Sequence, residues 1–283
     1  MKPSPFSYEK PGSLSELFGC LTTHGDEATI LAGGQSLVAT LNMRLSSPGV
    51  VVDINGIDEL KGISVDGDTL RIGALTRHVE LEKSADVEKH APLVHMAMPH
   101  IAHVAIRNRG TFGGSIAFAD PAAELPACVL ALNGRIELTS ANGSRTVEAV
   151  DFFKDLYDTD LQPGEVVSAV ELPVQKGRQR AAFDELARRH GDYAMAGLAA
   201  VANVDGGVVS SARFVFFGVG ATPMLAANAS AALTGAVTDG QIESAQKALE
   251  NDLSPFDDIN SSAAMKMHLA KELLGRVARQ LIS

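Results

Sequence analysis

The chain has 283 residues, of which 46% are hydrophobic and 20% are charged, and its formal net charge is −10. This length and composition predict a well-buried core divided into two or three subdomains, and they exclude a disordered chain. The acidic balance and the absence of any Lys/Arg run argue against a nucleic-acid partner.

Cysteine usage and hydropathy narrow the class of protein further. Cys20 and Cys128 lie far apart without a partner pattern, so the chain predicts neither a disulfide framework nor a Cys-ligated iron–sulfur cluster of its own. No apolar run approaches the length of a membrane span, and the polar first ten residues lack a signal-peptide pattern. We therefore expect a cytoplasmic protein.

Residues 1–55 are typical of a compact β-α-β unit. Ser13 begins an S-x-x-E capping box, and the segment AGGQS at Ala32–Ser36 follows a short apolar run. A right-handed crossover would bring this segment to the carboxyl end of its strand. The expected elements are a strand at 6–8, a helix from Ser13 to about Leu21, a strand at Thr29–Leu31, a helix at Leu37–Arg44 and a strand at Val50–Ile54.

Residues 56–175 contain two hairpin signals, Asp66-Gly67-Asp68 and Asn142-Gly143, each between alternating runs. The other expected elements are a helix capped by Thr76, a helix over Leu93–His103, a helix that begins at Asp120-Pro121 and stops at Asn133-Gly134, one or two helical turns within Asp151–Tyr157 and a strand at Val166–Leu172.

A domain boundary is predicted near Lys176, in the polar and basic segment QKGRQR. Residues 176–283 then form a separate unit with strands first and helices last. The expected strands are 181–186, 194–204 and 208–218, and the expected helices are 226–233, 239–251 and 263–282.

Two widely separated glycine pairs indicate the chemistry. Gly33-Gly34 lies in AGGQS, and Gly113-Gly114 lies in IRNRGTFGGS at Ile106–Ser115, each flanked by hydroxyl side chains. Because glycine lacks a Cβ, such backbone can approach a ligand closely, and N–H groups near a helix start favour an anion. Either pair alone is more often an ordinary tight turn. Together they favour two loops that clamp one pyrophosphate.

With both loops in view, the chain resembles the FAD-binding medium subunit of the molybdenum hydroxylases, the xanthine dehydrogenase and carbon monoxide dehydrogenase type. The resemblance covers nearly the whole chain. The motifs that carry it are AGGQS at Ala32–Ser36, IRNRGTFGGS at Ile106–Ser115, ADPAAELPA at Ala119–Ala127, PGEVVSAVELP at Pro163–Pro173 and RRHGDYAMAG at Arg188–Gly197.

The resemblance implies an α+β fold. Residues 1–55 and 56–175 would be two FAD-binding subdomains of the PCMH/vanillyl-alcohol-oxidase-like type, with an extended FAD between them. Residues 176–283 would be a C-terminal domain with an antiparallel sheet and a helix bundle.

The resemblance also implies a set of cofactor-binding residues, with no catalytic acid–base pair and no metal site in this chain. Glu124 falls where family members carry an acidic residue near the flavin, and Tyr193 falls on an aromatic position near the isoalloxazine ring. From the residues alone, Glu124 equally suits a helix dipole, and Tyr193 suits a packed strand. The implied set is Ile30, Ala32, Gly33, Gly34, Gln35, Ser36, Ile101, Thr111, Gly113, Gly114, Ser115, Glu124, Val167 and Tyr193.

Three positions depart from the family pattern. Ser115 stands where relatives often have Asn, and Phe118 stands where close relatives have His. Asp184 and Glu185 stand where many relatives carry a Lys, which leaves open how this chain would stabilise a reduced, negative flavin.

The function implied by the resemblance is electron transfer within a heterotrimeric molybdenum hydroxylase, and a dimer of heterotrimers is one assembly that it allows. Electrons would arrive from a small [2Fe–2S] subunit, hydroxylation would occur on a large molybdopterin subunit, and NAD, a quinone or oxygen would be the acceptor. Two alternatives stay open: a stand-alone FAD reductase like the enolpyruvyl-sugar reductases, and a non-catalytic adaptor. No G-x-G-x-x-G or Gly-Lys-Ser/Thr motif supports a Rossmann domain or a P-loop.

Overall fold

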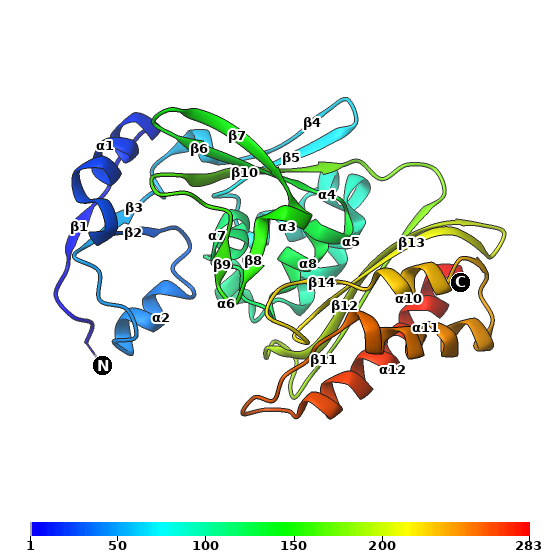
Figure 1. Ribbon diagram of the computed structural model, residues 1–283. Helices are drawn as coiled ribbons and strands as arrows, with labels where there is room; N and C mark the ends of the chain where they lie inside the picture. Colours follow the sequence, from blue (N-terminus) through cyan, green and yellow to red (C-terminus); the bar gives the residue numbers. More distant parts are fainter. Residues whose placement is uncertain (1) are drawn as a thin grey trace.

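The computed structural model describes residues 2–283, and its first part is a small parallel sheet at one end of the molecule (Figure 1). The strand order is β1 (Ser7–Glu9), β3 (Val50–Asp53), β2 (Ala28–Leu31), and β3 pairs in parallel with both neighbours. All four β3 residues are buried, as expected of a central strand. The flanking helices are α1 (Leu14–His24) and α2 (Leu37–Asn42), so the predicted β-α-β unit is confirmed.

The second part is a five-stranded antiparallel sheet built from the two predicted hairpins and one further strand. Its strand order is β4 (Ile63–Asp66), β5 (Thr69–Gly73), β10 (Val166–Pro173), β6 (Arg135–Ser140) and β7 (Gly143–Glu148). The helices of this part are α3 (His78–Lys83), α4 (Ala85–His90), α5 (Pro92–Ala97), α6 (Val104–Arg107), α7 (Phe112–Phe118), α8 (Glu124–Ala131) and the short α9 (Ala149–Phe152). After α9, β8 (Phe153–Asp155) pairs with β9 (Asp158–Thr159), so the segment expected to be helical is half strand.

Two helix starts differ from prediction. The residue before α3 is Arg77, not Thr76, because the Thr76 hydroxyl donates instead to the carbonyl of Gly62 at 3.1 Å. The helix expected at Asp120 begins at Glu124, because the Asp120 carboxylate accepts the N–H of Ala122 at 2.9 Å and closes a turn before the helix.

The helix expected over Leu93–His103 ends early as an α-helix. Its α-helical part, α5, stops at Ala97 and continues only as a 3₁₀ turn over Met98–His100. Pro99 lies in that turn and has no N–H to donate, so the α-helical ladder stops there.

The third part is an antiparallel sheet with helices on one face (Figure 1). The strand order is β11 (Gln179–Ala187), β12 (Ala194–Asp205), β13 (Val208–Phe217) and β14 (Met224–Leu225), and β15 (Gly235–Ala236) pairs with β13. The covering helices are α10 (Ala227–Ala232), α11 (Asp239–Asp252) and α12 (Ala263–Ile282). The implied sheet and helical layer are therefore present.

The C-terminal sheet is buried on both faces. One face packs against α10, α11 and α12 in a single hydrophobic cluster. Phe183 and Phe217 on the other face join a second cluster that includes α5, α8 and the five-stranded sheet. This second cluster joins the C-terminal sheet to the middle of the chain.

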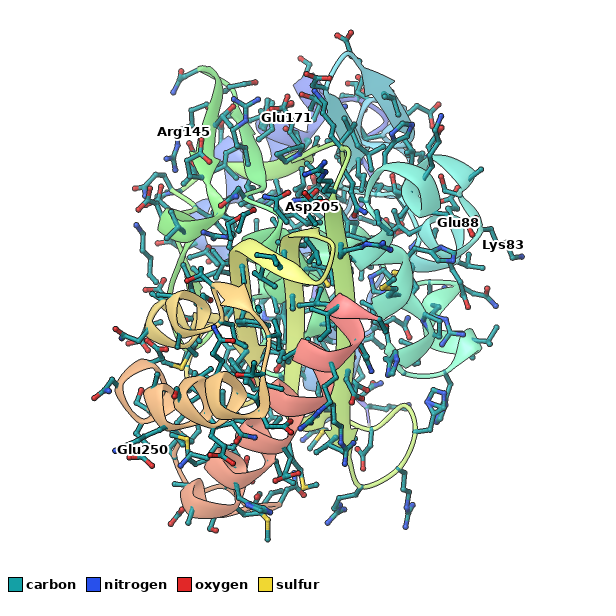
Figure 2. All side chains as sticks on the ribbon, turned by 90° about the vertical axis from the view of Figure 1, so that its right-hand side faces the viewer. Lys83, Glu88, Arg145, Glu171, Asp205 and Glu250 are labelled. Carbon is teal, nitrogen blue, oxygen red and sulfur yellow. The ribbon has the colours of Figure 1, made fainter. Side chains whose placement is uncertain are left out.

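Many charged side chains lie on the outside of this arrangement. Lys83, Glu88, Asp205 and Glu250 are exposed and project from the surface (Figure 2). Within residues 2–283, no helix combines the length and the apolar character that crossing a membrane would require.

Candidate functional site

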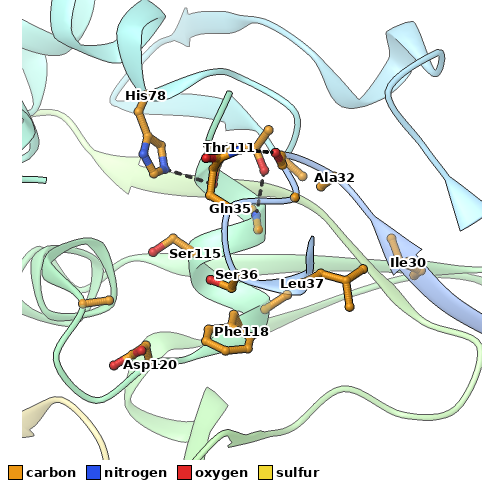
Figure 3. Close-up of a pocket in the computed structure, with 18 of the residues that line it drawn as sticks. Ile30, Ala32, Gln35, Ser36, Leu37, His78, Thr111, Ser115, Phe118 and Asp120 are labelled. Atoms are coloured by element: carbon orange, nitrogen blue, oxygen red, sulfur yellow. Dashed lines mark hydrogen bonds between the residues drawn. The ribbon is translucent and has the colours of Figure 1, made fainter. Parts of the chain in front are cut away.

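One cavity of about 730 Å³ lies where the three parts of the chain meet. Its walls come from residues 29–54 of the first part, from 74–124 and 161–167 of the second, and from the loop 191–193 that enters β12. This volume is within the range of sites that hold a small molecule or cofactor. Every cofactor-binding residue expected from the sequence lines this one cavity, and Figure 3 draws Gln35, Ser36, Thr111 and Ser115 among them.

The first glycine loop supplies unused main-chain donors. It joins β2 to α2, and Gly34 has a φ of +73°, which favours glycine. Among residues 2–283, no acceptor takes the N–H groups of the five residues from Gly33 to Leu37. The side chain of Ser36, which precedes α2, makes no capping hydrogen bond. Consecutive free N–H groups along a cavity wall form a favourable place for an anion.

The second glycine pair does not form an open loop but the first turn of α7. The three N–H groups of this turn already have acceptors: Phe112 donates to Thr76 O at 2.9 Å, Gly113 to Ala74 O at 2.8 Å and Gly114 to the Thr111 hydroxyl at 3.2 Å. The expectation of a second set of free N–H groups is therefore wrong for these residues.

On this side of the cavity, hydroxyl groups remain. Ser115 Oγ makes no hydrogen bond within residues 2–283, and Thr111 accepts one hydrogen bond and keeps its own proton to donate.

Close packing of the protein explains why Gly33 and Gly113 must be glycines. A Cβ built on Gly33 would lie 2.4 Å from the carbonyl oxygen of Arg109, and one built on Gly113 would lie 2.4 Å from the Cβ of Ala74. These glycines make room for other segments of the chain. They also bring the two motifs into direct contact, since Gly33 meets the backbone just before Thr111.

Apolar side chains form much of the remaining wall. Ile101 and Val167 are 7% and 5% exposed, and both line the cavity with Ile30. Tyr193 also lines it and is 64% exposed, so the interpretation as a packed strand residue is wrong. Tyr193 lies just before β12, in the loop that completes the cavity from the C-terminal side.

Glu124 is the most perturbed acidic group of the cavity. Burial, together with the nearby charge of Glu185, raises its pKa to about 8. Glu124 makes no side-chain hydrogen bond within residues 2–283. The carboxyl group is therefore mostly protonated at neutral pH, and its first-turn position in α8 does not offset the cost of burial.

The two adjacent acidic residues of β11, Asp184 and Glu185, have different surroundings. Glu185 has a 5% exposed side chain with Oε1 3.5 Å from His100 Nδ1, whereas its Oε2 is buried without a partner. Asp184 lies 3.7 Å from Arg276 of α12. Glu185 therefore faces the middle of the molecule, and Asp184 faces the covering helices.

Sequence reasoning missed His78, and Arg107 of the second glycine motif is a structural residue beside the cavity. His78 lines the cavity, is hydrogen-bonded through Nε2 to Thr111 O at 3.1 Å, and its burial lowers its pKa to about 4. Arg107 is 7% exposed, pairs with Glu82 at 2.9 Å and donates to the carbonyl of Ile101. No motif marks His78, whereas Arg107 lies inside the second glycine motif.

Two family models together match nearly the whole chain. Residues 4–175 match the family model described as the FAD binding domain in molybdopterin dehydrogenase. Residues 181–281 match the CO dehydrogenase flavoprotein C-terminal domain.

Relatives of known function and solved structures agree with these matches. The 6-hydroxypseudooxynicotine dehydrogenase complex subunit alpha of Paenarthrobacter nicotinovorans is 37% identical over 98% of this chain and 94% of its own. The carbon monoxide dehydrogenase medium chain of Hydrogenophaga pseudoflava is 35% identical over 98% of this chain and 96% of its own.

Among solved structures, carbon monoxide dehydrogenase from Hydrogenophaga pseudoflava that lacks the Mo-pyranopterin moiety of its cofactor superposes with a TM-score of 0.96 at 36% identity, covering 100% of both chains. Quinoline 2-oxidoreductase from Pseudomonas putida 86 superposes with a TM-score of 0.94 at 37% identity, also over 100% of both chains. The chain therefore belongs to the medium, FAD-binding subunits of the molybdenum hydroxylases, as an oxidoreductase subunit.

Proposed function

We propose that the cavity holds one FAD with its pyrophosphate at the first glycine loop, and that the chain passes electrons from a partner [2Fe–2S] subunit to an external acceptor. The observation that carries this proposal is the run of free N–H groups from Gly33 to Leu37 in a cavity shared by all three parts of the chain. Ser115 and Thr111 add hydroxyl donors from the opposite segment.

The chain's own residues would bind and orient the cofactor. FAD itself supplies the redox chemistry, because it accepts electrons singly and releases them in pairs. Ile101 and Val167 give apolar walls that exclude water, and Tyr193 closes the cavity from the C-terminal loop. Glu124, protonated near neutral pH, is positioned to donate a hydrogen bond into the cavity.

We divide the chain into three units, residues 1–55, 56–175 and 176–283, and each unit contributes residues to the wall of the cavity. The partners would be a small iron–sulfur subunit and a large molybdopterin subunit, with two heterotrimers paired. Cys128 is buried and Cys20 is a single half-buried thiol, so the metal clusters belong on partner chains. NAD, a quinone and oxygen are the acceptors to test.

The test is to purify the native complex, identify its chains, and measure flavin, iron and molybdenum together. The proposal predicts one flavin for this chain, with iron and molybdenum present only when the partner chains co-purify. The reduced complex is then mixed with NAD, a quinone or oxygen in separate anaerobic runs, and flavin absorbance reports the acceptor. Metal bound by the isolated chain would contradict the proposal.

A stand-alone FAD reductase is the competing function, and Glu124 supplies the protonated acid that such an enzyme needs. The isolated chain is assayed for reduction of a nucleotide-sugar enoyl ether by NADPH. Sustained turnover without partner chains would favour this function over electron transfer within a complex.

A further inference from the structure

Two side chains outside the cavity connect the two glycine motifs. Asn55 and Arg77 do not line the cavity, but each contacts the backbone of a residue beside it. Asn55 follows β3 in the first part of the chain, and Arg77 precedes α3 in the second part. Their contacts form a continuous hydrogen-bonded path from one part to the other.

The first half of the path holds the AGGQS loop. Asn55 Nδ2 donates to the carbonyl of Ala32 at 2.8 Å and to Asp53 Oδ1 at 2.6 Å. Asp53 is 9% exposed at the end of the central strand, and its Oδ2 accepts the hydroxyl of Tyr8 at 2.5 Å. Asn55 is therefore held by the rigid parallel sheet, and it fixes the carbonyl immediately before Gly33.

The second half of the path reaches the other motif. Arg77 Nη2 donates to Asn55 Oδ1 at 2.5 Å, and its Nη1 donates to the carbonyl of Arg109. That same carbonyl oxygen is the one a Cβ on Gly33 would meet. The path thus ends at Arg109, where the two motifs touch and which is two residues before Thr111.

We infer that Asn55 and Arg77 are positioning residues for the dinucleotide clamp: they hold the free N–H groups after Gly33 and the hydroxyls of Thr111 and Ser115 at a fixed separation. This inference rests on the proposed function for its ligand. It also makes a claim that can be tested without the ligand, because every contact in the path joins two groups of this chain. A clamp ordered before binding loses less entropy when the ligand arrives.

The experiment uses the full chain with two variants that break different ends of the path. Asn55→Ala frees the AGGQS loop, and Arg77→Gln shortens the side chain that reaches Arg109. The matched controls are Asn203→Ala, which removes an exposed hydrogen bond to Ser211, and Arg279→Gln, which removes a surface ion pair with Asp239. Both controls lie in the C-terminal part, away from the cavity.

Hydrogen exchange of the FAD-free chains is the first readout. Asn55→Ala should speed exchange of the Val38 and Thr40 amides, which donate to the carbonyls of Gly34 and Ser36 in the loop, at least ten-fold. Arg77→Gln should do the same mainly at the amides of Arg109 and Gly110, which donate to the carbonyl of Ile106. FAD affinity, measured by quenching of flavin fluorescence, is the second readout. Both variants should bind FAD at least ten-fold more weakly than the two controls.

Exchange in these segments that matches the controls would overturn the inference, and so would unchanged FAD affinity in both variants. Thermal unfolding of all four proteins separates these results from general loss of fold, since the exchange change must be confined to the named segments. If the wild-type chain fails to take up FAD, the proposed function fails instead, and the exchange readout still decides the inference.

Discussion

At the scale of single residues, Gly113 shows why a glycine motif does not report directly on a ligand. Its missing Cβ leaves room for Ala74 at the end of β5, and its N–H donates to the Ala74 carbonyl. The motif is therefore a packing device that brings Thr111 and Ser115 to the cavity wall. Substitution at Gly113 should act on the fold first and on the ligand second.

Gly113→Ala should lower the free energy of unfolding of the FAD-free chain by about 2 kcal/mol, because overpacking a tight contact costs about that much. Gly240→Ala is the matched control, since Gly240 lies in α11 with no atom within 4 Å of a built Cβ. That control should be neutral or slightly stabilising. Urea unfolding checks both, and equal midpoints for the two variants would contradict the packing explanation.

Glu124 makes the stability of the FAD-free chain depend on pH. Its pKa is about 8 in the folded chain and near 4.5 when unfolded, so between these values the folded state holds a proton that the unfolded state has lost. Stability from this group therefore falls as pH rises from about 4.5 to 8. Glu124→Gln should raise the melting temperature by a few degrees at pH 8 and leave it unchanged at pH 4.5. A constant difference across this range would rule out burial of Glu124 as the cause.

At the scale of secondary-structure elements, Arg213 connects the C-terminal sheet to the middle of the molecule. From β13 its guanidinium donates to the carbonyls of Leu130 at 3.0 Å and Ala131 at 3.3 Å, at the end of α8. The Leu130 carbonyl also accepts the N–H of Asn133 at 3.2 Å, whereas the Ala131 carbonyl accepts no backbone N–H within residues 2–283, so a charged donor at this helix end is favourable. Burial lowers the pKa of Arg213, as expected for a guanidinium at an interface.

Arg213→Met should cost about 2 kcal/mol of unfolding free energy, because hydrogen bonds to charged groups contribute about 1.5–3 kcal/mol. Arg279→Met, which removes an ion pair whose Arg side chain is 59% exposed, should cost less than about 1 kcal/mol. Chemical unfolding followed by circular dichroism compares the two. If both variants unfold at the same denaturant concentration, Arg213 does not hold the interface.

The elements that the sequence predicted well have signals within a few residues. Asn142-Gly143 gave its hairpin, and Ser262 caps α12 so that the helix spans Ala263–Ile282 as expected. The errors at the two glycine motifs arose because a distant segment determines what each glycine contacts. Ala74 and Arg109 determine what Gly113 and Gly33 do, and neither contact can be read from the local pattern.

The residues of the site were likewise predicted where a motif marks them and missed where only a distant contact does. The motifs identified residues that do line one cavity, because a family resemblance carries information about distant contacts. His78 and the path through Asn55 were missed because they lie outside the glycine motifs and act through the backbone of residues 32 and 109–111.

At the scale of the whole molecule, the cavity depends on all three parts of the chain, so a ligand there should stabilise the fold as a unit. FAD at one hundred times its dissociation constant should add about 2.7 kcal/mol to the free energy of unfolding. Differential scanning calorimetry with and without FAD checks this. A shift confined to one of two separate transitions would mean that the ligand contacts only one part.

The most direct test of the FAD clamp is a titration of the FAD-free chain with FAD and, separately, with FMN. If the free N–H groups from Gly33 to Leu37 hold a pyrophosphate, FAD binds at one per chain and FMN binds at least a hundred-fold more weakly. Equal affinity for FMN, or no uptake of FAD, would contradict the account.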